Sequence, residues 1–226
     1  MTDAIDSAVS GLSLADTAYH AVLEMLLEAK FVGGNPVQER RLAEQLKISR
    51  TPVREALSRL QSEGLLTGDG SRTLRVAQIG IAEFVEILNA RKLLEVEAAG
   101  LAAEKGVRGV AVEEVRRAIS DLLELEDPTP GQHWTVDDLV HGLVSEGARS
   151  KLLAGLILDL RRRTHVFNTR RLPHRRAPGA AEHLAIIDAL VARDAPRARA
   201  AMALHIDNVK AAIINELLHP EHGTGL

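Results

Sequence analysis

The segment from Glu39 to Leu66 constrains the fold of this chain more than any other part of the sequence. It predicts two short amphipathic helices that are joined by a tight turn. In the first helix the apolar side chains fall on one stripe, formed by Leu42, Ala43 and Leu46. In the second helix they recur at the spacing of a buried helical face, at Val53, Ala56, Leu57 and Leu60. Each helix therefore has one side that packs into a small core.

The opposite face of the second helix carries two arginines. Arg50 and Arg54 lie one turn apart and point away from the apolar face, toward something outside the domain. Thr51 and Pro52 predict the start of this helix, because a threonine hydroxyl can cap a free N–H and proline fits the first helical position. Gly64 predicts its end. A helix that presents Ser, Arg, Thr and Arg at its N-terminal end is typical of a helix-turn-helix that enters the major groove of DNA.

The next segment, Thr67 to Val76, predicts a β-hairpin with Arg72 at or near its tip, which completes a winged helix. Helix N-termini and arginine side chains can bind phosphates, and arginine can also contact guanine through two hydrogen bonds. We expect Arg50 and Arg54 to contact bases, and Arg40 and Arg72 to contact phosphates. The full set of expected DNA contacts is Arg40, Ser49, Arg50, Thr51, Pro52, Arg54, Gly70 and Arg72. By pattern alone, two packed helices with solvated arginines are an equal alternative.

The segment from Ser49 to Leu57, S-R-T-P-V-R-E-A-L, closely resembles the signature of the GntR family of bacterial transcription regulators. The flanking residues resemble that family as well, at Glu39-Arg40, Leu42-Ala43 and Glu63-Gly64-Leu65. The resemblance covers about residues 12 to 76. It implies a homodimer whose recognition helices enter adjacent major grooves of a pseudo-palindromic operator in double-stranded DNA.

Composition limits the class of protein without identifying its function. The chain has 226 residues, of which 46% are hydrophobic and 26% are charged, the balance of an ordinary globular protein. Its formal net charge is −3, but the stretch from Gln38 to Arg75 holds eight Lys or Arg against five Asp or Glu. A basic patch on an acidic body suits DNA binding that depends on local placement of charge.

Several features argue against a secreted or membrane protein. The chain has no cysteine, and no segment approaches the roughly 20 uninterrupted apolar residues of a membrane span. The first residues show neither the basic nor the apolar region of a signal peptide. We therefore expect a cytoplasmic protein without a membrane partner.

The chain is expected to divide into a winged helix and a helical bundle. The predicted parts are a flexible N-terminus (1–11), the winged helix (12–76), a linker (77–80), the bundle (81–219) and a tail (220–226). Glycine and proline separate the helical segments of the bundle, which are predicted near 81–105, 111–126, 134–147, 150–170, 179–193 and 196–218. The predicted fold class is mainly α, with an N-terminal winged helix-turn-helix and a C-terminal all-helical bundle of about six helices.

Four side chains of the bundle predict a metal site. Asp137 and His141 are spaced i, i+4, so they share one helical face. His183 and His205 each lie 11 residues from Asp194, the centre of the turn between the last two predicted helices. In an antiparallel hairpin they therefore lie at the same height, about 16 Å from the turn, and both fall on apolar stripes. Three imidazoles and a carboxylate that converge inside a bundle suit a divalent metal ion with open positions for water or a ligand.

The spacing of these four residues does not by itself require a metal. A single histidine on an apolar face is more often a hydrogen-bonded core residue than a ligand, and Asp137 could be a charge at a helix N-terminus. Asp138 could replace Asp137, although its i, i+3 spacing to His141 is less familiar for a ligand pair. A metal-dependent enzyme that activates water is a rival function. No general base is evident beside the site, however, and an enzyme would not need a winged helix.

The same residues resemble the FCD effector domain of the FadR-like branch of GntR regulators. The resemblance lies in the Asp-x-x-x-His of Asp137 and His141, the Glu-His that ends at His183, and the late His205, 22 positions further on. It implies that these four residues bind a divalent metal, with Zn as the first choice and Ni or another first-row ion as alternatives. It also implies that the metal helps to hold a small carboxylate effector.

Further residues are expected near that effector. Arg91 and Glu95 look like the Arg-x-x-x-Glu of the same family, and the Arg91 guanidinium can hold a carboxylate through two hydrogen bonds. Asn208 is the second expected effector contact. Seven arginines lie between Arg161 and Arg176. We expect them first on a solvated or dimer surface, next beside an acidic effector, and last at DNA.

Taken together, these features predict a DNA-binding transcription regulator that acts as a repressor. They do not favour an enzyme. A small organic acid bound at the metal would bias the relative placement of the two winged helices and so change operator affinity. A regulator whose effector site holds no metal is the remaining alternative.

Overall fold

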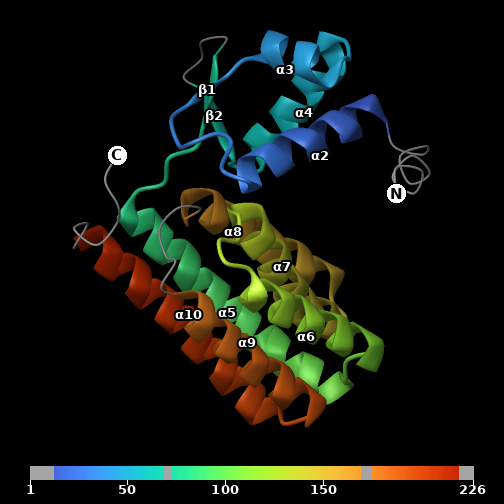
Figure 1. Ribbon diagram of the computed structural model, residues 1–226, viewed down its shortest axis with the longest axis vertical. Coiled ribbons are helices and arrows are strands. Elements are labelled where there is room, and N and C mark those ends of the chain that lie inside the picture. The colour runs from blue at the N-terminus through green and yellow to red at the C-terminus, as the bar shows by residue number, and fades with distance from the viewer. Residues whose placement is uncertain (1–12, 69–72, 169–174, 219–226) are drawn as a thin grey trace. The chain divides into compact units, whose positions relative to one another are not determined.

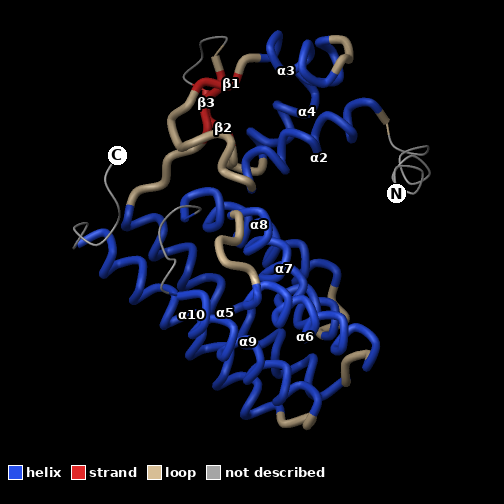
Figure 2. The backbone as a smooth tube through the Cα atoms, in the orientation of Figure 1, coloured by secondary structure: helices blue, strands red, loops and turns tan. Residues whose placement is uncertain are grey.

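The computed structural model describes residues 13–68, 73–168 and 175–218. Two compact units divide the chain, Met1–Gln78 and Ile79–Leu226, each with its own buried residues. Helices dominate both units, and the short strands all belong to the first (Figure 2). None of the helices in the described ranges is long and apolar enough to cross a membrane.

The first unit is a winged helix, as predicted. Its described helices are α2 (Leu14–Leu27), α3 (Glu39–Leu46) and α4 (Arg50–Ser62), and its strands are β1 (Pro36–Val37), β2 (Leu66–Gly68) and β3 (Leu74–Val76) (Figure 1). The strands form an antiparallel sheet in the order β1-β3-β2. Helix α2 packs on α4, and the side chains of Tyr19, Leu26 and Leu60 are fully buried in this unit.

Helix α4 buries the apolar face that the sequence predicts. The relative exposure of Val53, Ala56, Leu57 and Leu60 is at most 3%. The predicted helix start is wrong, because α4 begins at Arg50 and Ser49 takes the N-cap position without a side-chain hydrogen bond. Thr51 therefore lies inside the first turn rather than at the cap. Gly64 follows the C-cap with a left-handed φ of 75°, which confirms the predicted stop.

The β2–β3 hairpin has the predicted position. Thr67 lies opposite Arg75 in an antiparallel pair. The expected DNA contacts of the hairpin tip, Gly70 and Arg72, lie outside the described residues.

The first strand, β1, was not predicted, because a strand of two residues, one of them a proline, carries no alternating pattern. Gly34 turns the chain into β1 with a left-handed φ of 83°. Its N–H donates to the carbonyl of Val76 over 2.9 Å, which ties the turn to β3. The segment of Gly33, Gly34 and Asn35 thus positions an edge strand.

The second unit is a bundle of six described helices, as predicted. These are α5 (Ile81–Lys105), α6 (Gly109–Glu124), α7 (Pro130–Gly147), α8 (Lys151–Asn168), α9 (Arg176–Val191) and α10 (Ala195–Leu218). Helix α5 contacts α7, α8, α9 and α10, and it runs beside α10 along most of its length (Figure 1). The buried face of α5 includes four alanines with no exposed surface, Ala98, Ala99, Ala102 and Ala103. Small side chains allow the neighbouring helices to approach closely, which suits a core with few aromatics.

Helix α7 begins four residues before the predicted position 134. Thr129 and Gln132 form a capping box, in which each side chain accepts a hydrogen bond from the other's backbone N–H. Pro130 is the first helical residue rather than part of the preceding loop. This start gives α7 an extra turn ahead of Asp137, so Asp137 lies inside the helix and is not a charge at its N-terminus.

Candidate functional site

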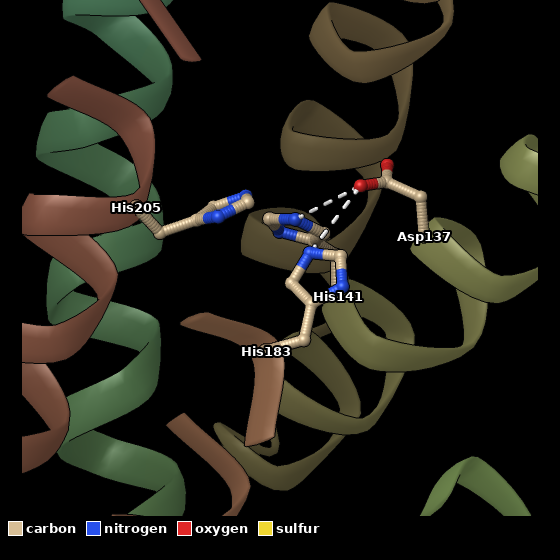
Figure 3. A group of neighbouring side chains, drawn as sticks. All are labelled: Asp137, His141, His183 and His205. Atoms are coloured by element: carbon tan, nitrogen blue, oxygen red, sulfur yellow. Dashed lines mark ion pairs between the residues drawn. The ribbon is translucent and has the colours of Figure 1, made fainter. Parts of the chain in front are cut away.

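Three helices bring Asp137, His141, His183 and His205 together (Figure 3). Helix α7 carries the first two, one turn apart, and α9 and α10 carry one histidine each. Because α9 and α10 form a hairpin that turns at Asp194, His183 and His205 lie level, with ring centroids 4.6 Å apart. One candidate ligand atom from each of the four residues lies within 4.8 Å of the others.

The three histidine rings are buried, and two of their Nε2 atoms face Asp137. The distance from Asp137 Oδ1 is 3.5 Å to His141 Nε2 and 3.6 Å to His183 Nε2 (dashed lines in Figure 3). Both Nε2 atoms are buried and have no hydrogen-bond partner in the described ranges. Unpaired buried polar atoms are rare because they are unfavourable. Three imidazoles and one carboxylate fit a divalent ion such as Zn, which would satisfy both atoms.

Two carboxylates determine which ring nitrogen of His141 and of His205 can bind an ion. His141 Nδ1 hydrogen-bonds to Glu95 Oε2 on α5, and His205 Nδ1 lies 2.9 Å from Glu182 Oε2 on α9. An ionised carboxylate accepts a hydrogen bond, so Nδ1 of these two rings carries a hydrogen and Nε2 is the nitrogen left to bind an ion. Metal-binding histidines are commonly oriented in this way. The sequence motifs include both glutamates but did not predict that they orient these histidines.

Both carboxylates are in turn held by cationic or amide groups. Arg91 Nε donates to Glu95 Oε1 over 2.7 Å. Glu182 accepts two hydrogen bonds from Arg175, at 3.0 and 2.6 Å, and one from Asn208 Nδ2 at 2.8 Å. The two expected effector contacts, Arg91 and Asn208, therefore bind glutamates that orient the candidate ligands.

Arg161 corrects the expectation of a solvated arginine segment. Its relative exposure is 2%, and it donates to Asp137 Oδ2 and to Asp138 Oδ1, both over 2.7 Å. The guanidinium also lies over the ring of Trp134, 4.8 Å from its centroid. Two carboxylates and an aromatic face make this burial favourable. Asp138 belongs to this pair and not to the candidate metal group, whereas Asp137 keeps Oδ1 free for a ligand role.

The electrostatic environment gives three of the four ligands the charge states that a metal requires. Burial would lower the pKa of His141, but the charges of Glu95 and Asp137 raise it, so a metal would have to displace a proton from that ring. Burial by itself would raise the pKa of Asp137, but the charges of His141 and Arg161 outweigh it and hold that pKa well below its usual range. Burial, together with the charge of His205, holds the pKa of His183 well below its usual range. Burial also lowers the pKa of His205. These groups therefore offer a carboxylate and two neutral imidazoles near neutral pH.

A cavity of about 580 Å³ opens beside the four residues. Asp137, His183 and His205 line one part of it. Its lining also contains four arginines, Arg91, Arg161, Arg175 and Arg176. Apolar side chains such as Phe84 and Val209 make up much of the rest. This size and lining suit a small anionic molecule. Asn208 is not among the described residues that line the cavity.

The candidate DNA contacts of the first unit lie on α3 and at the N-terminal end of α4. The exposed residues are Arg40, Ser49, Arg50, Thr51 and Arg54, and Pro52 is half-buried. The sequence pattern did not reveal the role of Glu39, whose carboxylate accepts hydrogen bonds from both Arg50 and Arg54. The residues are 11 and 15 positions apart, so their contact follows from how the two helices cross and not from spacing along one helix.

Comparison with known proteins agrees with both units. Residues 14–76 match the bacterial regulatory proteins of the gntR family, and residues 86–208 match the FCD domain. The HTH-type transcriptional regulator LutR of Bacillus subtilis (strain 168) is 31% identical over 195 residues, which cover 75% of this chain and 86% of LutR. The Uxu operon transcriptional regulator of Escherichia coli (strain K12) is 28% identical over 202 residues, which cover 78% and 77%.

The fold is also found in solved structures. The structure of E. coli McbR/YncC matches with a TM-score of 0.77 at 23% identity, over 91% of this chain and 99% of that one. The matched families and relatives are transcription regulators and not enzymes, which decides against the metal-dependent enzyme. The chain belongs to the GntR family of transcription regulators, in the FadR-like branch that joins a helix-turn-helix domain to a C-terminal FCD domain.

Proposed function

We propose that this regulator is a repressor whose operator affinity is controlled by a small organic acid bound at a divalent metal. Asp137, His141, His183 and His205 are the proposed ligands, and Zn is the preferred ion, with Ni or another first-row metal as alternatives. The observation that carries the proposal is the pair of buried Nε2 atoms, on His141 and His183, that face Asp137 but lack hydrogen-bond partners in the described residues. When bound, the ion supplies positive charge and open coordination positions for a carboxylate.

The cavity supports an acidic effector. Arg91 and Arg161 line it on the side of the candidate ligands, so a carboxylate there lies close to two guanidinium groups. We propose Arg91 as an effector contact through its remaining N–H groups. Asn208 is proposed to act indirectly, because its amide holds Glu182 and Glu182 holds His205.

In the first unit, we propose that Arg50 and Arg54 contact bases and that Arg40 and Arg72 contact phosphates. Ser49, Thr51, Pro52 and Gly70 complete the proposed contact set at the start of α4 and in the wing. A helix-turn-helix protein reads two half-sites as a dimer, which supports a homodimer on a pseudo-palindromic operator.

Elemental analysis of the purified full-length protein tests the metal, with identification of any co-purified acid. We expect one ion per chain, and a sharp loss of metal in His183→Ala. The matched control is His20→Ala, an exposed histidine of the first unit, which should keep the metal. Effector affinity should fall in parallel with metal content across the variants. A well-folded, metal-free protein that binds its acid at full strength would instead support a regulator whose site holds no metal.

Thermal unfolding provides an independent measure. The proposed site takes ligands from three helices and exists only in the folded bundle, so bound metal stabilises the fold. A chelator should lower the melting temperature of the parent. It should not lower that of His183→Ala further.

A further inference from the structure

Glu39, the first residue of α3, contacts both arginines that are proposed to read DNA bases. Arg50 Nε donates to Glu39 Oε1 over 2.7 Å. Arg54 donates to the same carboxylate twice, from Nε to Oε2 over 2.9 Å and from Nη2 to Oε1 over 3.0 Å. The glutamate side chain is 21% exposed, whereas the two arginines are 61% and 67% exposed. A partly buried carboxylate therefore joins two guanidinium groups that reach into solvent.

The carboxylate of Glu39 is charged near neutral pH. The hydrogen bond from Arg54, opposed by burial and assisted by Arg50, lowers the pKa of Glu39 below its ordinary value. The same contact raises the pKa of Arg54. The three side chains together thus carry one net positive charge rather than two.

The contacts leave donors for DNA. A guanidinium has five N–H groups, and a guanine accepts two hydrogen bonds at O6 and N7. In the part of the chain that the structure describes, Arg50 gives Glu39 one donor, at Nε, and Arg54 gives one edge, Nε with Nη2. Both side chains can therefore contact a base while their bonds to Glu39 stay in place.

We infer that Glu39 is a specificity-determining residue, which aligns Arg50 and Arg54 for bases and reduces their attraction to phosphates of any sequence. The inference rests on the proposed role of the two arginines as base contacts. Side chains that are ordered before binding lose less conformational freedom when they meet the correct bases. Binding to arbitrary DNA depends on the release of counterions from phosphates, and a nearby carboxylate weakens that contribution.

Removal of the negative charge should therefore move two affinities in opposite directions. Glu39→Gln should weaken binding to the specific duplex and strengthen binding to a scrambled one. Exposed ion pairs contribute little to folding, so the melting temperature should stay close to that of the parent. A purely structural role would lower stability and weaken binding to both duplexes together.

The experiment uses the full-length protein and two duplexes, one selected by the parent from a randomised library and one scrambled with the same composition. For Glu39→Gln we expect the ratio of the two affinities to fall about tenfold or more. The salt dependence on the scrambled duplex should become steeper. Glu44→Gln is the matched control, because it removes the same charge from α3 but pairs with Arg40. It should change both affinities alike and leave their ratio within about twofold of the parent.

Further variants separate the alignment of the arginines from the effect of charge. They also separate the role of Glu39 from the proposed base contacts. Glu39→Asp keeps the charge but shortens the reach, so it should weaken specific binding without strengthening binding to the scrambled duplex. Added to the double variant Arg50→Ala, Arg54→Ala, the change Glu39→Gln should have no further effect on the ratio. If the arginine variants lose discrimination while Glu39→Gln keeps the parent ratio, the inference is overturned and the proposed base contacts stand. If the arginine variants themselves bind like the parent, the base contacts are overturned, and this inference with them.

Discussion

His141 Nδ1 hydrogen-bonds to Glu95 Oε2, so a buried acid of α5 orients a candidate metal ligand of α7. Glu95 is 1% exposed and is neutralised on its other oxygen by Arg91. Burial alone would raise the pKa of Glu95, but the charges of Arg91 and His141 lower it well below its usual range. The carboxylate therefore stays ionised and holds a proton on His141 Nδ1, so Nε2 is the nitrogen that faces Asp137 and would bind an ion.

We expect Glu95→Gln to weaken metal binding about 10- to 100-fold, the usual effect of losing an outer carboxylate partner of a ligating histidine. The amide can still accept from Nδ1, but it removes the negative charge that makes the imidazole a better donor and leaves Arg91 without its counterion. Competition between the protein and a chelator of known affinity measures the change.

Glu97→Gln is the control for that variant. Glu97 lies on the same helix, is 56% exposed, and pairs with Arg199 rather than with the site. It should bind metal like the parent. Parent-like metal affinity in a folded Glu95→Gln protein would contradict the role of Glu95.

Single arginine replacements separate base contacts from phosphate contacts. Arg50→Ala or Arg54→Ala should each reduce discrimination between specific and scrambled DNA by about 1–3 kcal/mol. Arg40, whose side chain is 79% exposed, should act differently, because a phosphate contact carries no sequence information. Arg40→Ala should weaken binding to both duplexes alike and reduce the salt dependence. Equal losses of discrimination in all three variants would contradict this division of roles.

The sequence predicts the elements of this fold well where one helix or hairpin contains the whole pattern. The apolar stripe of α4 ends at Leu60 and is buried as expected. The pairing of His183 with His205 needed only the position of the α9–α10 turn, because two antiparallel helices keep equal rise on both sides of Asp194. Strand β1, by contrast, is too short to carry a period and exists only because β3 pairs with it.

The groups around the candidate ligands were harder to predict, since they come from other helices. Arg161 stands in a run of arginines whose local pattern indicates solvent, and only the packing of α8 against α7 brings it to Asp137. Glu182 precedes His183 in the sequence, but its bond is to His205 on the next helix. Glu39 likewise meets Arg54 through a helix crossing. Such contacts depend on the angle between elements, which periodicity does not encode.

Acid pH should reveal the stabilisation that Glu182 gives to the metal-free bundle. Burial would raise its pKa, but hydrogen bonds from His205, Arg175 and Asn208 lower it from 4.5 to about 2. A carboxyl group whose pKa is lower in the folded state stabilises the fold at any pH above its pKa in the unfolded state. That contribution is lost as the pH falls toward its pKa in the folded state. The contribution of Glu182 should therefore be complete above pH 4.5 and disappear between 4.5 and about 2.

Urea unfolding with chelator present measures this effect as the difference in unfolding free energy between the parent and Glu182→Gln. The difference should be constant near neutral pH and shrink as pH falls below 4.5. The other carboxylates titrate in both proteins, so their contribution to the unfolding free energy cancels in the difference. If this difference in unfolding free energy did not change with pH, the charge of Glu182 would not be the source of the stabilisation, and the loss in the variant would come from altered packing.

Two glycines of the bundle test how closely its helices are packed. A Cβ on Gly147, the last residue of α7, would lie 2.8 Å from the Cβ of Ala102 and 3.0 Å from Cγ1 of Val107. The Cβ of Ala102 is fixed to its backbone and cannot move without shifting α5. A Cβ on Gly100 would instead overlap the guanidinium of Arg199, which is the far end of a flexible side chain.

We expect Gly147→Ala to destabilise the protein by about 1–3 kcal/mol, as overpacking of a close contact does. Gly100→Ala should be nearly neutral. It displaces Arg199 from its ion pairs with Glu97 and Glu104, which are exposed and worth about 0–1 kcal/mol. The alanine stabilises the helix by a similar free energy, about 0.5–1 kcal/mol, because glycine is unfavourable inside a helix. Chemical unfolding of both variants gives the two free energies, and a Gly100→Ala protein that is the less stable of the pair would show that Arg199 cannot move aside.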